Sequence, residues 1–261
     1  MPGPAVEFER RGAVGWIRLS RPETGNAMDL QLLSELGDAM RQCEADASIR
    51  AVVLTGSGKF FCVGGALDTM RNPDELGLRI REMTFHLHSV IAALARMRAP
   101  VIAAVNGPAA GAGLSLAIAC DVVIASESAR FSSSYAAAGL PSDGGQSWTL
   151  PRRIGHGRAR EMMLLDRRLT AGEAADWGLV NEVASPADLE ARAGELAEKL
   201  AAGPTAAFGR IKGLLTDGDR SGLETQLELE ARAMAKSVLS PDSQEGITAF
   251  LEKRAPVFKG V

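Results

Sequence analysis

Two short stretches of the sequence are rich in small residues and could present backbone amides to a ligand. Residues 59–68 contain Gly64-Gly65, and residues 106–115 contain Gly111-Ala112-Gly113. Glycine lets a ligand approach the backbone closely, and the first amides of a helix lack intrahelical acceptors. Two loops of this kind can converge on one oxygen atom and stabilise a developing negative charge, with each amide contributing roughly 3 kcal/mol.

Each stretch also has a simpler interpretation. Gly64-Gly65 alone is compatible with an ordinary turn, and the small residues of the second stretch are compatible with close packing of a helix. The combination is more specific than either part. We therefore expect two amides to face the same ligand atom, one near Gly65 and one at the start of the helix that begins within residues 106–115.

The elements around these loops predict an α/β fold. Both loops follow short apolar runs, at residues 51–55 and 101–105, that are typical of strands buried on both faces. Residues 6–10 and 14–20 form a hairpin-like pair, and residue 29 can cap a helix over 30–43. Further helices are expected over 75–97 and 109–120, with a strand at 122–125. Strands that alternate with helices imply a parallel sheet wrapped by helices.

The strand signal fades after about Ser147. Helices are predicted over residues 158–165, 171–178, 187–202, 205–215, 223–238 and 243–253. These helices have little sheet to cover, so we expect their apolar faces to pack against another subunit.

Composition excludes several classes of partner. The chain has 29 Lys and Arg against 32 Asp and Glu, which argues against nucleic acid as a partner. No window reaches the roughly 18 apolar residues that a membrane span needs, and the N-terminus lacks a signal-peptide pattern, so we expect a cytoplasmic protein. The cysteines, Cys43, Cys62 and Cys120, are odd in number and widely spaced. His86 and His88 are two apart on a predicted helix and point to different faces, so no metal site is expected.

Ordered motifs along nearly the whole chain carry a family resemblance. They are Arg21-Pro22 with Asn26-Ala27, residues 61–65, residues 104–107 with 111–113, residues 119–121, residues 172–174 with 177–180, Glu245-Gly246 and residues 250–254. On these motifs the sequence resembles the enoyl-CoA hydratase/isomerase (crotonase) superfamily. The resemblance implies a spiral of ββα turns over residues 1–200 and a C-terminal helical trimerisation and CoA-capping region over 201–261. It also implies a homotrimer or a dimer of trimers.

The resemblance further implies an acyl-CoA thioester substrate, with coenzyme A as part of the substrate and no separate cofactor. By position, the amides of Gly65 and Ala112 resemble the oxyanion hole, although the family usually has glycine at the second position. The residues that resemble the substrate and CoA contacts are Ala27, Val63, Ala66, Leu67, Pro108, Tyr135, Phe250 and Lys253.

The choice of reaction depends on three positions. Hydratases of this family use two glutamates, whose positions here hold Ser115 and Tyr135. The segment 139–148 instead resembles the phenylacetate-pathway isomerase branch, which implies Asp143 as the acid/base, although Asp before Gly-Gly is also common in Asx turns. The phenol of Tyr135 could donate to the substrate, or it could pack with its hydroxyl at the rim.

We therefore expect an isomerase that moves a double bond from the 3 to the 2 position of an enoyl-CoA or rearranges an epoxidised aromatic acyl-CoA. Four alternatives remain open. They are a hydratase with atypical acid/base residues, an aroyl-CoA dehalogenase with Asp143 as nucleophile, a naphthoate synthase, and a non-catalytic acyl-CoA-binding protein. The chain is only 5% aromatic, which disfavours an enzyme that must hold an aromatic ring.

Overall fold

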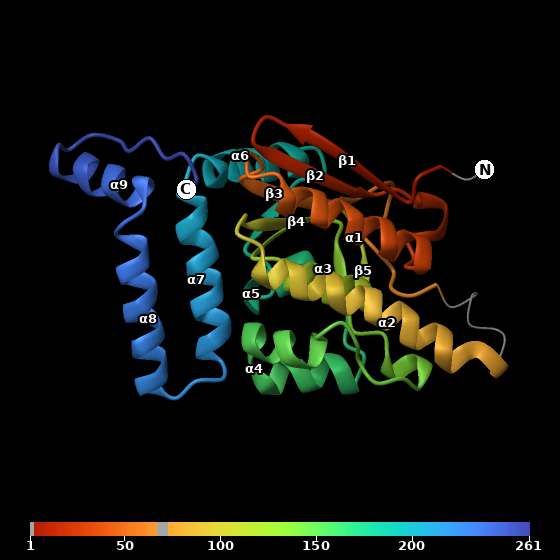
Figure 1. Cartoon of the computed structure of the whole chain (residues 1–261). Helices are drawn as coiled ribbons and strands as arrows, with labels where there is room; N and C mark the ends of the chain where they lie inside the picture. The colour runs from red at the N-terminus through yellow and green to blue at the C-terminus, as the bar shows by residue number, and fades with distance from the viewer. Residues whose placement is uncertain (1–2, 67–72) are drawn as a thin grey trace.

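A six-stranded sheet forms the centre of the computed structural model, which describes residues 3–66 and 73–261 (Figure 1). Its order is β1-β2-β3-β4-β6-β9. β1 pairs antiparallel with β2, and the following pairs are all parallel. The predicted hairpin and parallel sheet are thus confirmed. The strands are β1 (Val6–Arg11), β2 (Val14–Leu19), β3 (Ala51–Gly56), β4 (Val101–Val105), β6 (Val122–Ser126) and β9 (Glu182–Ala184).

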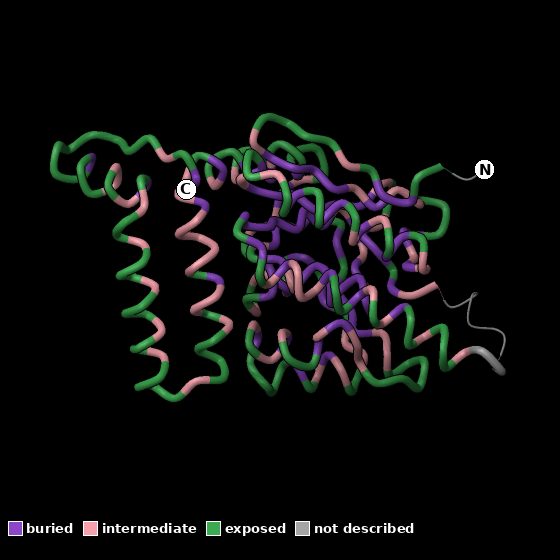
Figure 2. The backbone as a smooth tube through the Cα atoms, in the orientation of Figure 1, coloured by how far each residue is buried: buried purple, intermediate pink, exposed green. Residues whose placement is uncertain are grey.

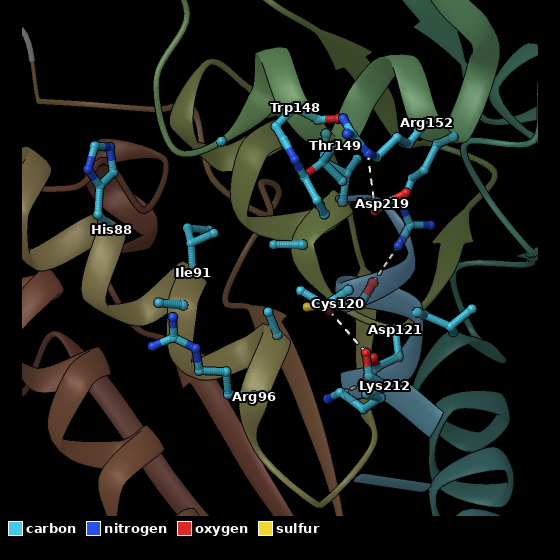
Figure 3. A pocket seen from close by; sticks show the side chains of 18 of the residues that line it. His88, Ile91, Arg96, Cys120, Asp121, Trp148, Thr149, Arg152, Lys212 and Asp219 are labelled. Carbon is cyan, nitrogen blue, oxygen red and sulfur yellow. Dashed lines mark hydrogen bonds and ion pairs between the residues drawn. The ribbon is translucent and has the colours of Figure 1, made fainter. Parts of the chain in front are cut away.

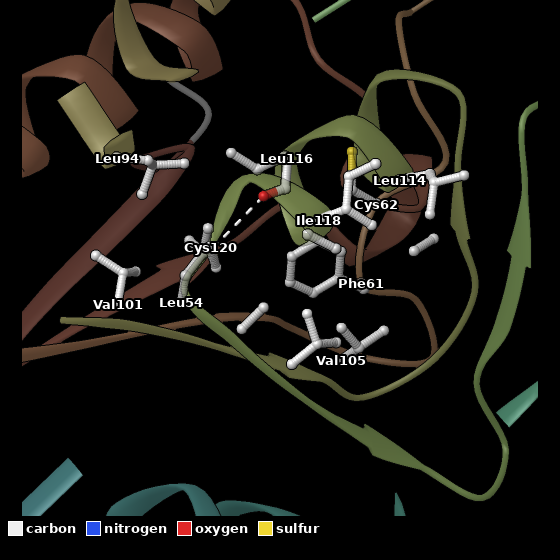
Figure 4. Close-up of a cluster of buried hydrophobic side chains, with 14 of the residues drawn as sticks. Leu54, Phe61, Cys62, Leu94, Val101, Val105, Leu114, Leu116, Ile118 and Cys120 are labelled. Carbon is white, nitrogen blue, oxygen red and sulfur yellow. Dashed lines mark hydrogen bonds between the residues drawn. The ribbon is translucent and has the colours of Figure 1, made fainter. Parts of the chain in front are cut away.

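Helices cover both faces of this sheet. One face packs against α6 (Leu189–Ala201), and the other packs against α1 (Leu30–Ala45), α2 (Pro73–Arg96) and α3 (Ala112–Ala119). α1 begins where predicted because the side chain of Asp29 accepts a hydrogen bond from Leu32 N at 2.8 Å. The fully buried Phe61 lies inside the larger core, beside side chains of β3, β4 and α3 (Figure 4).

The sequence analysis did not predict several short strands. Residues 109–120 were expected to be one helix, but β5 (Ala109–Ala110) precedes α3. β5 joins β7 (Arg130–Ser132) and β8 (Leu169–Thr170) in a small second sheet, and β9 also follows the point where strand signal fades. Strands of two or three residues are too short to show a period of two.

α4 (Gln146–Leu164) begins well before the predicted residue 158. Pro151 lies inside it, and Gly155 has a non-helical φ of 79°. Both residues interrupt the apolar periodicity, which hid the first part of the helix.

The C-terminal helices extend away from the sheet. They are α7 (Thr205–Gly218), α8 (Leu223–Ser237) and α9 (Pro241–Leu251), and the shorter α5 (Ala171–Asp176) lies within the body of the protein. Figure 2 shows that α8 and α9 are mostly exposed, whereas the sheet is buried. α7 is tied to the body because Lys212 Nζ donates to Asp121 at 2.7 Å and to Leu94 O at 2.9 Å. Within the described ranges, no helix is both long and apolar enough to cross a membrane.

Gly113→Ala is expected to lower the free energy of unfolding by about 3 kcal/mol, because overpacking of a dense core is destabilising. A Cβ at this position of α3 would lie 2.1 Å from the carbonyl oxygen of Cys62. Urea unfolding checks the value. The control is Gly157→Ala, whose Cβ would meet nothing within 4 Å and which should be neutral or stabilising. Equal stabilities of the two variants would contradict the close contact.

Candidate active site

The two small-residue loops lie against each other at the ends of β3 and β4. Ala110 N donates to Cys62 O at 3.0 Å, which joins the two loops side by side. Gly64 has a φ of +103°, and a Cβ there would lie 3.1 Å from Ala110 O and 3.5 Å from Ala112 N. A side chain at residue 64 would therefore be tight against Ala110 O and in contact with Ala112 N, and its backbone would be strained at this φ, whereas glycine avoids all three.

The amides of Gly65 and Ala112 are both available to a ligand. Met28 N donates to Gly64 O at 2.7 Å, and Ala66 N donates to Met28 O at 2.9 Å. These hydrogen bonds use the backbone groups on either side of Gly65 and do not involve the Gly65 amide. Ala112 is the first residue of α3, and its amide has no intrahelical acceptor. Over residues 3–66 and 73–261, neither amide donates to another protein group.

Gly65 and Ala112 both line one cavity of about 480 Å³. Its walls are mostly aliphatic, and Asp143 is the one carboxylate among the described lining residues. Four aliphatic residues of α2 recur at helical spacing on this wall. The lining consists of Met28, Leu33, Val63, Gly64, Gly65, Leu76, Ile80, Met83, Thr84, Leu87, Gly111, Ala112, Ser134, Tyr135, Ala138, Leu140, Pro141, Ser142 and Asp143.

Asp143 lies directly before a sharp turn into α4. Gly144 and Gly145 have φ of 62° and 71°, a left-handed pair that glycine adopts without strain. The Oδ1 atom of Asp143 lies 2.5 Å from His88 Nε2 on α2. Its Oδ2 atom has no partner in the part of the chain that the structure describes. One oxygen is thus held by the histidine, and the other is available to a ligand.

A buried polar network fixes Asp143 relative to the amides. Gln146 accepts from Ser133 Oγ at 2.6 Å and donates to Gly111 O at 3.3 Å. Ser115 Oγ donates to the main-chain carbonyl of Asp143 at 2.8 Å. Gln146 and Ser115 are both fully buried, so the loss of either partner would leave a costly unsatisfied group. The network joins the Gly111-Ala112 loop to the Asp143 loop.

Tyr135 is in the cavity wall, but its hydroxyl is not at the rim, so that interpretation of the sequence was wrong. The Oη atom is buried and makes no hydrogen bond to any described residue. Burial raises the pKa of Tyr135 to about 12, and the nearby Ser115 hydroxyl offsets part of this effect. The Ser115 hydroxyl donates instead to the carbonyls of Asp143 and Gly111.

The other predicted contact residues differ in where they lie. Val63 lines the cavity, whereas Ala27, Ala66 and Pro108 belong to neighbouring segments and are not among its lining residues. Leu67 falls outside the described residues.

Phe250 and Lys253 are not brought to this cavity within one chain. Phe250 is 82% exposed on α9, at the opposite side of the molecule from the first half of α2 (Figure 1). Lys253 follows the end of α9 and is exposed.

Sequence reasoning missed His88 and Gln146. His88 was considered only as a metal ligand, and its distance of 55 residues from Asp143 gives no local signal. Gln146 lies in the segment where the start of α4 was not recognised. The apolar spacing of Leu76, Ile80, Met83 and Leu87 could have identified the helix face that lines the cavity.

Tyr135, the one tyrosine of the chain, is expected to titrate near pH 12 in the folded protein and near 10 after unfolding in urea. The raised folded pKa means that the folded state keeps its proton longer than the unfolded chain. Its contribution to stability is therefore complete below pH 10 and is lost as the pH rises from about 10 to about 12. Absorbance at the phenolate band, with circular dichroism as the control for folding, measures both. A folded-state midpoint near 10 would show that the hydroxyl is solvated.

Comparison with known proteins agrees with this architecture. The family profile described as enoyl-CoA hydratase/isomerase matches residues 9–261. The chain is 38% identical over 250 residues to the 4-chlorobenzoyl coenzyme A dehalogenase-2 of an Arthrobacter species, covering 95% of this chain and 91% of the relative. It is also 38% identical over 250 residues to the 1,2-epoxyphenylacetyl-CoA isomerase of Escherichia coli, covering 94% of each protein.

A solved structure is similar over nearly its full length. The enoyl-CoA hydratase of Bacillus anthracis superposes with a TM-score of 0.92 at 34% identity, covering 98% of this chain and 100% of that one. With the matched profile and the shared arrangement of sheet and helices, the chain belongs to the enoyl-CoA hydratase/isomerase family of the crotonase superfamily.

Proposed function

We propose that this protein is an acyl-CoA isomerase that moves a double bond from the 3 to the 2 position of an enoyl-CoA. The observation that carries the proposal is the composition of one cavity. Its described lining combines a single carboxylate, on Asp143, with Gly65 and Ala112, whose amides donate to no described protein group. This set of groups suits a proton transfer through an enolate.

The reaction needs one base and one anion-binding site. The thioester oxygen accepts hydrogen bonds from Gly65 N and Ala112 N, and Asp143 removes a proton from C2. The electron pair of the C–H bond forms the dienolate, whose charge the two amides stabilise. Asp143 then returns a proton to C4, which leaves the double bond between C2 and C3. No water is added, and no other co-reactant is needed.

Hydration is disfavoured by the residues at the two glutamate positions. Ser115 has no carboxylate, and its hydroxyl is already committed to the Asp143 and Gly111 carbonyls. Tyr135 keeps its proton at neutral pH, since a phenol ordinarily titrates near pH 10 and burial raises the pKa of Tyr135 further, to about 12. Its hydroxyl, which has no hydrogen-bond partner among the described residues, can donate to a substrate but does not act as a base. Among the described lining residues, a hydratase would therefore have only the carboxylate of Asp143.

The cavity wall favours a flexible aliphatic acyl group. Its described lining is dominated by leucine, isoleucine and methionine, and Tyr135 is its one aromatic side chain. A ring epoxide of an aromatic acyl-CoA, the kind of substrate named for the Escherichia coli relative, would use the same carboxylate and amides. Coenzyme A would enter as part of either substrate, and no separate cofactor is required by this chemistry.

A second candidate function is hydrolytic dehalogenation, which the His88 contact favours. Asp143 would add to a halogenated ring carbon, halide would leave with its bonding pair, and water deprotonated by His88 would hydrolyse the resulting ester. His88 Nε2 lies 2.5 Å from Asp143 Oδ1, so the base is beside the carboxyl group whose ester would be hydrolysed. An aromatic ring would find few aromatic partners in the described wall, which is why we place this function second.

We also propose a homotrimer or a dimer of trimers. Large apolar side chains of the C-terminal helices are exposed in the single chain, among them Leu223, Met234, Leu239, Phe250 and Leu251 at 69–82%. Burial of such surfaces is the main driving force for stable association. Residues 201–261 would form this interface and would bring Phe250 and Lys253 to a neighbouring subunit's CoA.

Sedimentation equilibrium is expected to give a mass of three or six chains, each of 27.5 kDa. Phe250→Glu should shift the distribution towards smaller species, because a carboxylate would be buried without a partner. A monomer at all concentrations of the parent protein would contradict the proposal.

Asp143→Asn is expected to lower kcat for a 3-enoyl-CoA by about 10²–10⁴-fold, the usual contribution of a general acid/base. The measurement is the rise in conjugated thioester absorbance at constant mass. The matched control is Asp176→Asn, which removes an exposed carboxylate at the end of α5 and should leave kcat unchanged.

Three other outcomes would redirect the proposal. A gain of one water from a 2-enoyl-CoA would indicate a hydratase, and halide release from a 4-halobenzoyl-CoA would favour the second candidate function. Binding of acyl-CoA with no turnover of any of these substrates would indicate a non-catalytic protein.

A further inference from the structure

A second cavity lies behind Asp143, on the other side of the loop that carries it. Its volume is about 660 Å³, and none of its lining residues is shared with the first cavity. Figure 3 shows it between α2, which carries His88, α4, which carries Trp148 and Arg152, and α7, which carries Lys212. Asp143 lines the first cavity and Gly145 lines this rear cavity, so the turn 143–145 separates the two.

His88 contacts both sides of the turn 143–145. The residue lines the rear cavity, whereas its Nε2 atom lies 2.5 Å from Oδ1 of Asp143, which lines the first cavity. Its Nδ1 atom has no partner within the described ranges. The His88 side chain is 56% exposed, against 28% for Asp143. The imidazole therefore has one nitrogen on the carboxylate and one free for solvent.

The wall of the rear cavity carries polar groups that can hydrogen-bond to water. Thr149, Asp121, Asp219 and Arg152 supply hydrogen-bonding groups around its wall. The described wall of the first cavity is mostly aliphatic, and a bound acyl chain would displace water from it. While substrate is bound, the rear cavity is thus the more suitable source and acceptor of protons.

We propose that His88 exchanges the proton held by Asp143 with water in the rear cavity during turnover. The inference rests on the proposed isomerase function and adds a route for the proton. Without such a route, the proton taken from C2 stays on Asp143 and returns to C4 of the same molecule. With it, a proton from solvent reaches C4.

The exchange conserves protons at each step. With Nδ1 protonated and Nε2 unprotonated, Nε2 takes the proton of Asp143, and His88 becomes an imidazolium. The exposed ring then turns from Asp143 towards the rear cavity, loses its Nε2 proton to water and takes a solvent proton on the same atom. When the ring turns back, this solvent proton passes from Nε2 to Asp143. The carboxylic acid and the imidazole are regenerated in their starting forms, and one substrate proton has been replaced by one solvent proton.

A purely structural role for His88 makes a different prediction. As a hydrogen-bond donor that orients Asp143, His88 would affect kcat but would not decide whether the proton at C4 came from solvent. Glutamine separates the two roles, because its amide can donate a hydrogen bond to Asp143 but cannot pass a proton on.

The experiment is isomerisation of a 3-enoyl-CoA in D₂O, with deuterium at C4 of the product measured by mass spectrometry at low conversion. We expect the parent enzyme to form mainly deuterated product, and His88→Gln to form mainly undeuterated product while it continues to turn over. His86→Gln, two positions away on α2 and without a contact to Asp143, is the control and should match the parent.

Each contrary result is decisive. Undeuterated product from the parent, or the same deuterium content in parent and His88→Gln, would overturn the relay while leaving the isomerase function intact. A loss of kcat in His88→Gln with unchanged deuterium content would assign His88 to orientation of Asp143 alone. No isomerisation by the parent would overturn the proposed function and the relay with it.

Discussion

The close approach of two backbone segments is the constraint on which the rest of the site depends. The loop that ends in Gly64-Gly65 contacts the loop at Gly111-Ala112 with no side chain between them. A Cβ at Gly107 would lie 2.0 Å from Lys59 O, and one at Gly113 would lie 2.1 Å from Cys62 O. Glycine at these positions lets the loops after β3 and β4 come into close contact, as the proposed sharing of one ligand atom by the Gly65 and Ala112 amides requires.

The buried polar groups extend this constraint to Asp143, the proposed acid/base. Gln146 and Ser115 connect the Gly111 carbonyl with the main chain of Asp143, so the carboxylate is positioned from the same loop that supplies the Ala112 amide. Because Gln146 and Ser115 are both buried, such a network has few alternative arrangements. Ser115, which the family resemblance placed where hydratases are expected to have a glutamate, thus has a structural use here, which is consistent with Asp143 as the one carboxylate of the described lining.

Much of the fold follows from local sequence patterns. The parallel strands are buried on both faces and appear as continuous apolar runs, and α1 has both a cap at Asp29 and an apolar face. The prediction failed where the local signal is weak. β5 and β8 have two residues each, too few for a period, and α4 contains both Pro151 and a break at Gly155. These elements depend on contacts with distant parts of the chain rather than on their own composition.

The sequence by itself determined the family, through a series of short motifs whose residues are close together in the chain, and the same kind of local pattern predicted the two amide-bearing loops and the candidate acid/base. Only the tertiary structure decided that His88 contacts Asp143, that Tyr135 buries its hydroxyl, and that Phe250 lies far from the cavity of its own chain. Those features depend on how helices are rotated and packed against the sheet. Helical rotation is set by the summed burial of many apolar side chains, and no short stretch of sequence contains that sum.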